Sequence, residues 1–199
     1  GLISFSNLAQ TKTWDGSTDS DWTVGANWSD NTAPSLFDLN NDYVIPNVAN
    51  DPVISTGSYT IVGTITIASG ATLTFEGGSI THGAALDNDG RVILKGNSAW
   101  VQNASSTGTG DFQYVRSLAN SNWYVITSPV AGQDIDDFVT NSSLETSGSS
   151  SAFGTYSTLN DNYTYYTTGS TGTGNFTPGK GHTVSLAGSS GDLTFTGSN

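Results

Sequence analysis

The chain has 199 residues, no Cys and a formal net charge of −12, from 17 Asp and Glu against 5 Lys and Arg. Nucleic-acid binding needs clustered cations along a phosphate track, whereas the five cations here are scattered singly. We therefore expect no nucleic-acid partner, and the absence of Cys excludes disulfides, thiolate metal sites and a Cys nucleophile. No stretch reaches the roughly 18 apolar residues of a membrane-spanning helix, so no membrane insertion is expected.

The composition predicts an all-β protein with short strands. Glycine is abundant, with 24 residues, and Asn, Asp, Ser and Thr fill most gaps between short apolar segments, so turns are frequent. Good helix formers for exposed faces are scarce, because Lys is rare and only Glu76 and Glu145 among the acidic residues are Glu. The one helical turn that we expect lies at residues 133–139.

Residues 1–9 are mostly apolar and end in Ala9 before a polar stretch, as the tail of a secretory signal peptide does. We expect cleavage after Ala9 and export of the protein; a first β-strand is the alternative. Three Trp residues then follow within fifteen positions: Trp14, Trp22 and Trp28. Large indole rings this close need shared burial, so they are predicted to cap the end of a thin β structure, with a sugar-stacking platform as the alternative.

From Tyr43 to Trp100 the apolar positions recur about every 20 residues. Three sets show this spacing: Ile45, Ile65 and Leu86; Val53, Leu73 and Leu94; and Tyr59, Ile80 and Trp100. Such a repeat with three short strands per period is typical of a β-solenoid, in which each coil buries its inward side chains against its neighbours. We therefore predict about three coils of 20–21 residues, within a first domain of residues 10–115 that also holds the Trp-rich cap. An antiparallel sandwich is the alternative, because its hairpins also place turn signals every roughly 8–12 residues.

Residues 116–199 are predicted to form a small antiparallel β-sandwich. The 20-residue register fails after Trp100, and a Ser, Thr and Gly linker at 103–110 precedes a strand at 112–115. Further strands are expected at 123–126, 154–157, 163–167, 182–186 and 193–195, separated by long loops. The predicted fold class is therefore all-β, a short β-solenoid followed by a small antiparallel β-sandwich.

Several motifs make the chain resemble a known class of proteins. They are Thr13-Trp-Asp-Gly16, Ala26-Asn-Trp-Ser29, Val44-Ile-Pro46, Asn122-Trp-Tyr124 and Ser128-Pro-Val130. The chain is similar to the N-terminal region of secreted, adhesin-like cell-surface proteins of Bacteroidota, autotransporter-like cargo of the type IX secretion system. The resemblance implies an extracellular location at the cell surface. Because members of this class end in a C-terminal sorting domain, it also implies that the chain is an N-terminal part of a longer protein.

No arrangement of residues in the sequence predicts catalysis. The two histidines, His82 and His182, lack a Gly-x-Ser-x-Gly elbow and are expected at the surface or in turns. The segment 174–181 resembles a phosphate loop but contains Pro178 and precedes no helix, so it is predicted to be a β-turn. Glu76 gains no second carboxylate in the repeat register and is interpreted as a solvated turn residue.

Calcium is the metal ion that the sequence suits best, because hard carboxylate and amide oxygens are frequent. Candidate ligands for a structural calcium ion are Asp38, Asn40, Asp42, Asp87 and Asp89. The spacing of the first three imitates the start of a helix-loop-helix calcium loop, but the Gly and the distal Glu of such a loop are missing. The alternative is that these side chains are ordinary turn residues.

Aromatic residues in the second half are the best indication of ligand binding. Candidates that could stack on the faces of sugar rings are Trp123, Tyr124, Tyr163, Tyr165 and Tyr166, since such rings offer apolar area with a polar edge. In a strand, alternation places Tyr163 and Tyr165 on one face and Tyr166 on the other. We therefore expect at least one of these two sets to belong to the core.

These observations predict a noncatalytic, structural or adhesive segment of a secreted bacterial cell-surface protein, with extracellular glycans or further copies of itself as partners. Three alternatives stay open: a carbohydrate-binding accessory region of a secreted polysaccharide-degrading enzyme, a self-assembling extracellular fibre subunit, and an enzyme that uses Glu76 on the solenoid. Unpaired strand edges at the ends of a solenoid favour the fibre alternative. No cofactor is expected besides the candidate calcium ion.

Overall fold

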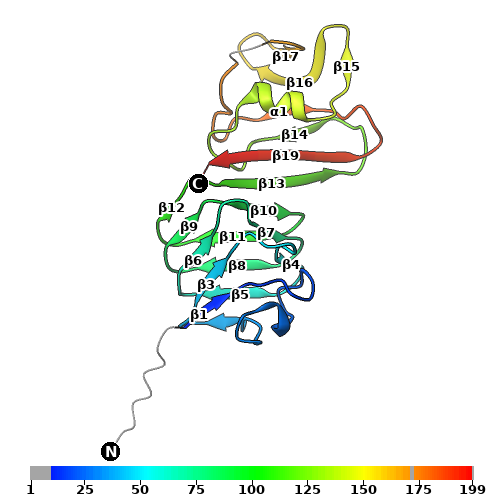
Figure 1. Ribbon diagram of the computed structural model, residues 1–199. Coiled ribbons are helices and arrows are strands. Elements are labelled where there is room, and N and C mark those ends of the chain that lie inside the picture. The colour runs from blue at the N-terminus through cyan, green and yellow to red at the C-terminus, as the bar shows by residue number, and fades with distance from the viewer. Residues whose placement is uncertain (1–9, 171–172, 199) are drawn as a thin grey trace, which may run out of the picture. The chain divides into compact units, whose positions relative to one another are not determined.

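The computed structural model describes residues 10–170 and 173–198, which form short strands, one 3₁₀-helix and one short α-helix (Figure 1). Residues 1–9, expected to be a signal-peptide remnant, lie outside the described residues. The chain divides into two compact units, the first ending at Phe112 and the second spanning Gln113–Ser198. None of the helices in these described ranges combines the length and apolar character of a membrane-crossing segment.

A β-solenoid of about four turns occupies residues 37–115, one turn more than expected. Its strands form three sheets. The first contains, in spatial order, β1 (Thr11–Thr13), β3 (Asp42–Ile45), β6 (Ile65–Ile67), β9 (Leu86–Asn88) and β12 (Ser106–Thr107). The second contains β4 (Val53–Ile54), β7 (Thr72–Phe75) and β10 (Arg91–Lys95), and the third β2 (Phe37–Asp38), β5 (Ser58–Ile61), β8 (Ser79–His82) and β11 (Ala99–Gln102). Strands of successive coils pair in parallel, which confirms the solenoid and excludes antiparallel hairpins here.

Inward side chains of successive coils stack on one another, as predicted. In the third sheet, Tyr59 pairs with Ile80 and Ile80 with Trp100, so this predicted stack is confirmed. In the first sheet the predicted step from Ile65 to Leu86 is confirmed, whereas the step from Ile45 to Ile65 is wrong by two residues. Ile65 lies opposite Tyr43, whereas Ile45 lies opposite Ile67.

In the second sheet the predicted step from Val53 to Leu73 is wrong by one residue, and the step from Leu73 to Leu94 is wrong by two. Val53 lies opposite Thr74, and the inward stack is formed by Ile54, Phe75 and Leu94 instead. A slip of one residue turns a side chain to the other face of its strand, and burial selects Ile54, which is 1% exposed, over the half-buried Val53.

The coils differ in length, which explains both errors. Leu73 pairs with Val92, 19 residues on, whereas Phe37 pairs with Thr60, 23 residues on. The turns between strands absorb these insertions, because each strand must still present its apolar residues to the interior. A single fixed period therefore locates the coils but not their register.

The three tryptophans of the first segment are buried together at the N-terminal end of the solenoid. Trp14, Trp22 and Trp28 are all 0% exposed, and the ring of Trp28 meets the other two edge to face at centroid distances of 5.2 and 4.7 Å. The Trp14 indole N–H donates to the carbonyl of Asn50 at 2.7 Å, and that of Trp28 to the carbonyl of Trp22 at 3.1 Å. The predicted cap is confirmed, and rings without exposed area exclude the sugar platform.

A short loop around the 3₁₀-helix Gly25–Asn27 holds this cap in place. The buried Asn27 side chain accepts from the backbone N–H groups of Thr18 and Asp19 at 2.9 and 3.0 Å. Its amide donates to the Asp19 carboxylate at 2.6 Å and to the Asp21 carbonyl at 3.0 Å. All hydrogen-bonding capacity of this side chain is thus used inside the loop.

The second unit contains an antiparallel sheet with the strand order β14 (Tyr124–Ile126), β18 (His182–Val184), β16 (Ser150–Ser157) and β15 (Thr146–Ser147). A further strand, β17 (Asn162–Thr167), forms an antiparallel hairpin with β16. Strands β13 (Asp111–Leu118) and β19 (Gly191–Ser198) are neighbours, and the chain passes from the first unit to the second within β13. The predicted antiparallel β module is confirmed.

The short helix α1 (Ile135–Asn141) lies where a helical turn was predicted. The carboxylate of Asp134 caps it by accepting from the backbone N–H of Asp137 at 3.0 Å. Buried aromatic rings dominate the core of this unit, with centroids 4.9–6.0 Å apart; they belong to Phe138, Phe153, Phe176 and Phe195.

Candidate functional site

One face of the β16–β17 hairpin carries exposed aromatic rings. Tyr156 lies opposite Tyr163, and their ring centroids are 5.0 Å apart. Tyr163 and Tyr165 follow along β17 with centroids 6.0 Å apart and ring planes inclined by 22°. Trp123, from the loop before β14, lies 5.9 Å from Tyr165 by ring centroid. We name these four residues the aromatic row; Trp123 is 55% exposed and the three tyrosines are 42–48% exposed.

Strand geometry explains why these rings share a face. Side chains two positions apart along a strand point to the same side, and so do directly paired residues of antiparallel strands. Tyr163 and Tyr165 therefore align with Tyr156 on the neighbouring strand. The Tyr156 hydroxyl donates to the Asp161 carboxylate, which fixes the end of the row and raises the pKa of that hydroxyl.

The structure brings together three of the five predicted aromatic residues, namely Trp123, Tyr163 and Tyr165. Tyr124 is only partly exposed, packs against the core and donates its hydroxyl to Asn120 at 2.8 Å. Tyr166 also packs against the core, in agreement with the expected alternation. The sequence analysis missed Tyr156, because its place in the row depends on the register of the hairpin.

A shallow, apolar hollow of about 160 Å³ opens beside the aromatic row. Trp123 and Tyr165 form part of its wall, and polar side chains stand around it: Glu145, Thr146, Ser147, Ser150 and Ser151. Apolar rings beside a few hydroxyl and carboxylate groups suit a ligand that offers both C–H faces and hydroxyl groups.

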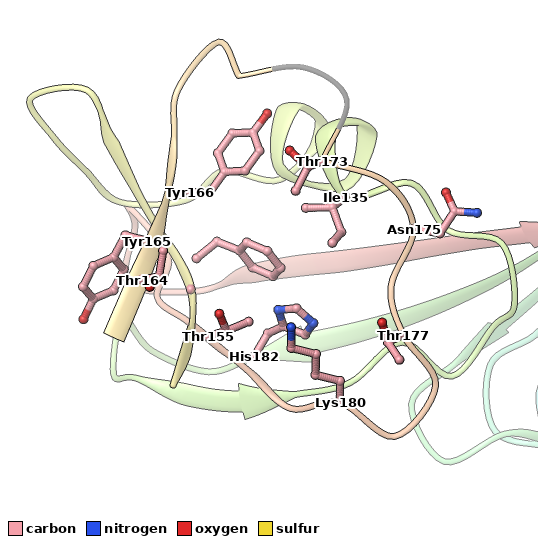
Figure 2. A pocket seen from close by; sticks show the side chains of 12 residues that line it. Ile135, Thr155, Thr164, Tyr165, Tyr166, Thr173, Asn175, Thr177, Lys180 and His182 are labelled. Atoms are coloured by element: carbon pink, nitrogen blue, oxygen red, sulfur yellow. The ribbon is translucent and has the colours of Figure 1, made fainter. Parts of the chain in front are cut away.

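A second pocket, of about 270 Å³, lies on the other face of the hairpin (Figure 2). Its wall includes Thr155 from β16, Thr164 and Tyr166 from β17, and His182 at the start of β18. Figure 2 shows the Tyr165 ring turned away from this pocket, although the residue contributes to its wall. The hairpin thus separates the aromatic row from what we name the His182 pocket.

His182 is buried, which contradicts its predicted place at the surface. Its side chain is 3% exposed, and its ring stacks on Phe153 and meets Phe176 edge to face, both at 4.9 Å between centroids. Burial, reinforced by the positive charge of Lys180, lowers the pKa of His182 to about 4, so the ring is neutral near pH 7. Within the described part of the chain, neither ring nitrogen has a hydrogen-bond partner.

His82 is also buried, inside the solenoid, so its predicted surface position is wrong too. Its Nδ1 lies 2.9 Å from the Gln102 side-chain oxygen and its Nε2 lies 2.8 Å from the Gly63 carbonyl. The Gln102 amide orientation is set by Trp100, whose indole N–H donates to the same oxygen at 2.9 Å. We therefore interpret His82 as a structural residue. It lies opposite Ile61 of the preceding coil and is the polar member of that inward stack.

The candidate calcium ligands near residue 40 are occupied by hydrogen bonds. Asp38 is buried and accepts from the Tyr43 hydroxyl at 2.5 Å and the Asn41 amide at 2.8 Å. Burial alone would raise the pKa of Asp38, but these hydrogen bonds outweigh it and hold the pKa below its usual value. Asn40 is exposed, and its backbone N–H donates to the same carboxylate at 3.2 Å.

The other candidate calcium ligands link neighbouring coils. The Asp42 carboxylate accepts from the backbone N–H and the hydroxyl of Thr64 at 2.7 and 2.8 Å. Asp89 does the same for Thr109 at 2.9 and 3.2 Å, and Asp87 accepts from the Thr107 hydroxyl at 3.2 Å. Among the residues that the structure describes, no three His, Asp or Glu side chains gather as a metal site would require.

Two further sequence features have definite places. Glu76 forms an ion pair with Lys95 of the next coil at 3.0 Å. The predicted β-turn in segment 174–181 is confirmed, because the Lys180 N–H donates to the Thr177 carbonyl at 3.0 Å and Gly179 has a φ of 75°. Pro178 and Gly179 occupy the two central positions that favour such a turn, which brings Lys180 to the His182 pocket.

Comparison with known proteins places the chain in a family without assigning it an activity. No curated protein and no solved structure matches the chain. One family model, described as a domain of unknown function (DUF8693), matches residues 13–198 and so covers both units. The chain is a member of this family.

Proposed function

We propose that the chain is a noncatalytic adhesive segment of a secreted bacterial cell-surface protein. In this proposal the solenoid is a spacer, and the second unit contacts extracellular glycans through the aromatic row. The observation that carries the proposal is the alignment of four exposed rings on one face of the second unit, with neighbouring centroids 5.0–6.0 Å apart.

Sugar rings suit such a surface. A pyranose has an apolar C–H face and a polar rim, and an aromatic ring buries that face while leaving the hydroxyl groups free to form hydrogen bonds. A continuous apolar patch that is exposed to water is unfavourable in free energy. A row of exposed rings on the protein surface therefore indicates a binding site. Several rings in line suit a polysaccharide chain better than a single sugar.

The spacer role rests on the way the solenoid is filled. Its interior is occupied by stacked apolar side chains, and its outward acidic residues pair with Thr or Lys of the next coil. Repeated coils of this kind form a stiff element, because every coil is fixed by the one before it.

Binding to a panel of soluble polysaccharides tests this proposal. We expect affinity electrophoresis or calorimetry to detect at least one neutral polysaccharide ligand. Trp123→Ala and Tyr165→Ala should each weaken binding at least tenfold, about 1.4 kcal/mol. Leu159→Ala, at a 92% exposed position between β16 and β17 but outside the row, is the matched control and should leave binding unchanged.

A carbohydrate-binding accessory region of a polysaccharide-degrading enzyme is the second candidate, because the same aromatic row suits it. The two candidates differ in what the bound polymer does for the parent protein. If the polysaccharide is also a substrate for an enzyme domain of the parent protein, the accessory role is favoured; attachment of cells through it favours adhesion. Equal loss of binding in the row variants and in Leu159→Ala would contradict both.

A further inference from the structure

The His182 pocket contains a buried polar side chain that the fold does not use. The imidazole of His182 is 97% buried, it lines the pocket, and neither of its nitrogens has a hydrogen-bond partner within the described residues. A neutral imidazole carries one N–H donor and one acceptor, and leaving both unsatisfied in the interior costs about 1–3 kcal/mol for each group. A ligand that supplies polar atoms would recover this free energy.

The pocket also contains a cation without a carboxylate partner. Within the described residues, ion pairs take up Lys12, Arg91 and Lys95, but not Lys180. Lys180 is exposed, and Arg116 is the other cation of the described residues that forms no ion pair, but of these two only Lys180 lines the pocket. Figure 2 shows the Lys180 side chain extending along the pocket toward the His182 ring.

Hydroxyl and amide groups line the remaining wall of the pocket. They come from Thr155, Thr164, Thr173, Thr177 and Asn175. Ile135 and Phe153 add apolar surface. The volume of about 270 Å³ lies just below the range of roughly 300–1,000 Å³ that small-molecule sites usually occupy, so a single sugar-sized ligand is the appropriate scale.

We propose that the His182 pocket binds one uronic acid unit, with Lys180 and the His182 N–H holding its carboxylate and the threonine hydroxyl groups facing its sugar hydroxyls. This goes beyond the proposed function, because the aromatic row lies on the opposite face of the hairpin and needs no charged ligand.

A carboxylate that is bonded to the Tyr166 and Thr173 part of the wall, but does not itself line the pocket, biases the orientation of the ligand. The Asp136 carboxylate accepts from the Tyr166 hydroxyl at 3.0 Å and from the Thr173 backbone N–H at 3.2 Å. Burial is the main cause that raises the pKa of the Tyr166 hydroxyl. The negative charges of Asp136 and then Asp134 raise this pKa further. A ligand carboxylate is repelled there and attracted at Lys180, so the hydroxylated end of the ligand faces Tyr166.

The test is a titration of the full chain with D-glucuronate, followed by two-dimensional amide and histidine NMR spectra. D-Glucose is the matched neutral probe, because it differs from glucuronate only by carrying a hydroxymethyl group in place of the carboxylate. We expect saturable shifts at His182 and its neighbours with glucuronate, and an apparent affinity at least tenfold lower for glucose. The pKa of His182 should rise in the complex, because a carboxylate next to the ring favours the imidazolium form.

Two charge-neutralising variants separate a specific site from a general charge effect. Lys180→Gln should weaken glucuronate binding at least tenfold, whereas Arg116→Gln, at an exposed position on β13, should stay within twofold of the wild type. His182→Phe keeps an aromatic ring between Phe153 and Phe176 and should also lose binding. Thermal midpoints no lower than that of the wild type would show that these variants are folded.

Three results would overturn the proposal: glucose binding as tightly as glucuronate, equal effects of the Lys180 and Arg116 variants, or acetate binding as tightly as glucuronate. The last would show that the sugar ring is not recognised. Trp123→Ala lies in the aromatic row and outside this pocket, so it should leave glucuronate binding intact. Failure of this proposal is therefore distinguishable from failure of the proposed function.

Discussion

Tyr165 lies directly opposite Gly154 in the β16–β17 hairpin, and the missing side chain of Gly154 makes room for its ring. A Cβ atom at residue 154 would lie 2.9 Å from Cδ1 of Tyr165 and 2.7 Å from the Thr164 carbonyl oxygen. The glycine therefore determines where the central ring of the aromatic row stands.

Gly154→Ala should displace Tyr165 and weaken polysaccharide binding while the chain stays folded. Contacts this short must be relieved by shifts of the ring or the strand, with a cost to stability of about 1–3 kcal/mol. Thermal unfolding and affinity electrophoresis measure the two effects. Gly191→Ala is the matched control, because its new Cβ would meet only Leu186, at an ordinary 3.4 Å. Wild-type binding by Gly154→Ala would disprove the positioning role.

Trp22→Ala should destabilise the first unit strongly. The ring is fully buried and touches both Trp14 and Trp28, so truncation leaves a cavity and costs about 3–5 kcal/mol. Urea unfolding followed by far-UV circular dichroism measures this loss. Trp123→Ala removes an exposed indole and should change stability by less than about 0.5 kcal/mol. Similar losses of unfolding free energy in the two variants would contradict the placement of Trp22 in the buried cap and of Trp123 at the surface.

The carboxylate of Asp38 should make the solenoid sensitive to acid. Its pKa is lowered in the folded chain, so its stabilising effect is full above the unfolded pKa near 3.8 and disappears as pH falls through the lower, folded pKa. We expect Asp38→Asn to be about 1–2 kcal/mol less stable than the wild type at pH 7 and to approach it below pH 4. Urea unfolding at a series of pH values measures this difference. A difference that stays constant down to pH 2 would rule out this role.

His182 should add to this loss of stability in acid, but in a higher pH range. Its pKa falls from 6.5 to about 4 on folding, so protonation favours the unfolded chain. Stability should be unaffected above pH 6.5 and should decrease as pH falls from 6.5 toward 4. His182→Phe lacks the titrating group, so the comparison of unfolding free energies over this range isolates its contribution. If the unfolding free energies of the wild type and His182→Phe change with pH in parallel, the conclusion that the His182 ring is buried and neutral is wrong.

The hydrogen bonds from Asp42 to Thr64 should couple neighbouring coils. Asp42→Ala removes the acceptor for a backbone N–H and a hydroxyl, and we expect a loss of about 1–2 kcal/mol. Asp42→Asn keeps one oxygen acceptor and should lose less than half of that amount. Thermal unfolding ranks the variants, and equal losses would show that the charge of Asp42, which both variants lack, matters more than the hydrogen bonds.

The coil architecture could be predicted from the sequence because it depends on a repeating apolar pattern. The pattern places Tyr59, Ile80 and Trp100 correctly, and also Ile65 with Leu86, whereas it misplaces Ile45 by two residues. The difference comes from turn length, since an insertion between strands shifts the numbering without changing which side chains are buried.

The candidate site was only partly predictable. Alternation within one strand placed Tyr163 and Tyr165 together and separated Tyr166. Tyr156 requires the pairing of β16 with β17, which a single strand does not reveal. Burial of His182 depends on Phe153 and Phe176, which only the folded unit brings around it.

Shielding of Trp123 from acrylamide tests the central claim, glycan contact through the aromatic row, most directly. Trp14, Trp22 and Trp28 are fully buried, so a neutral quencher reports mainly on Trp123 and, more weakly, on the half-buried Trp100. We predict that a saturating polysaccharide ligand lowers the quenching constant of the wild type, and that this decrease is absent in Trp123→Ala. An unchanged quenching constant in the wild type at full saturation would contradict the account.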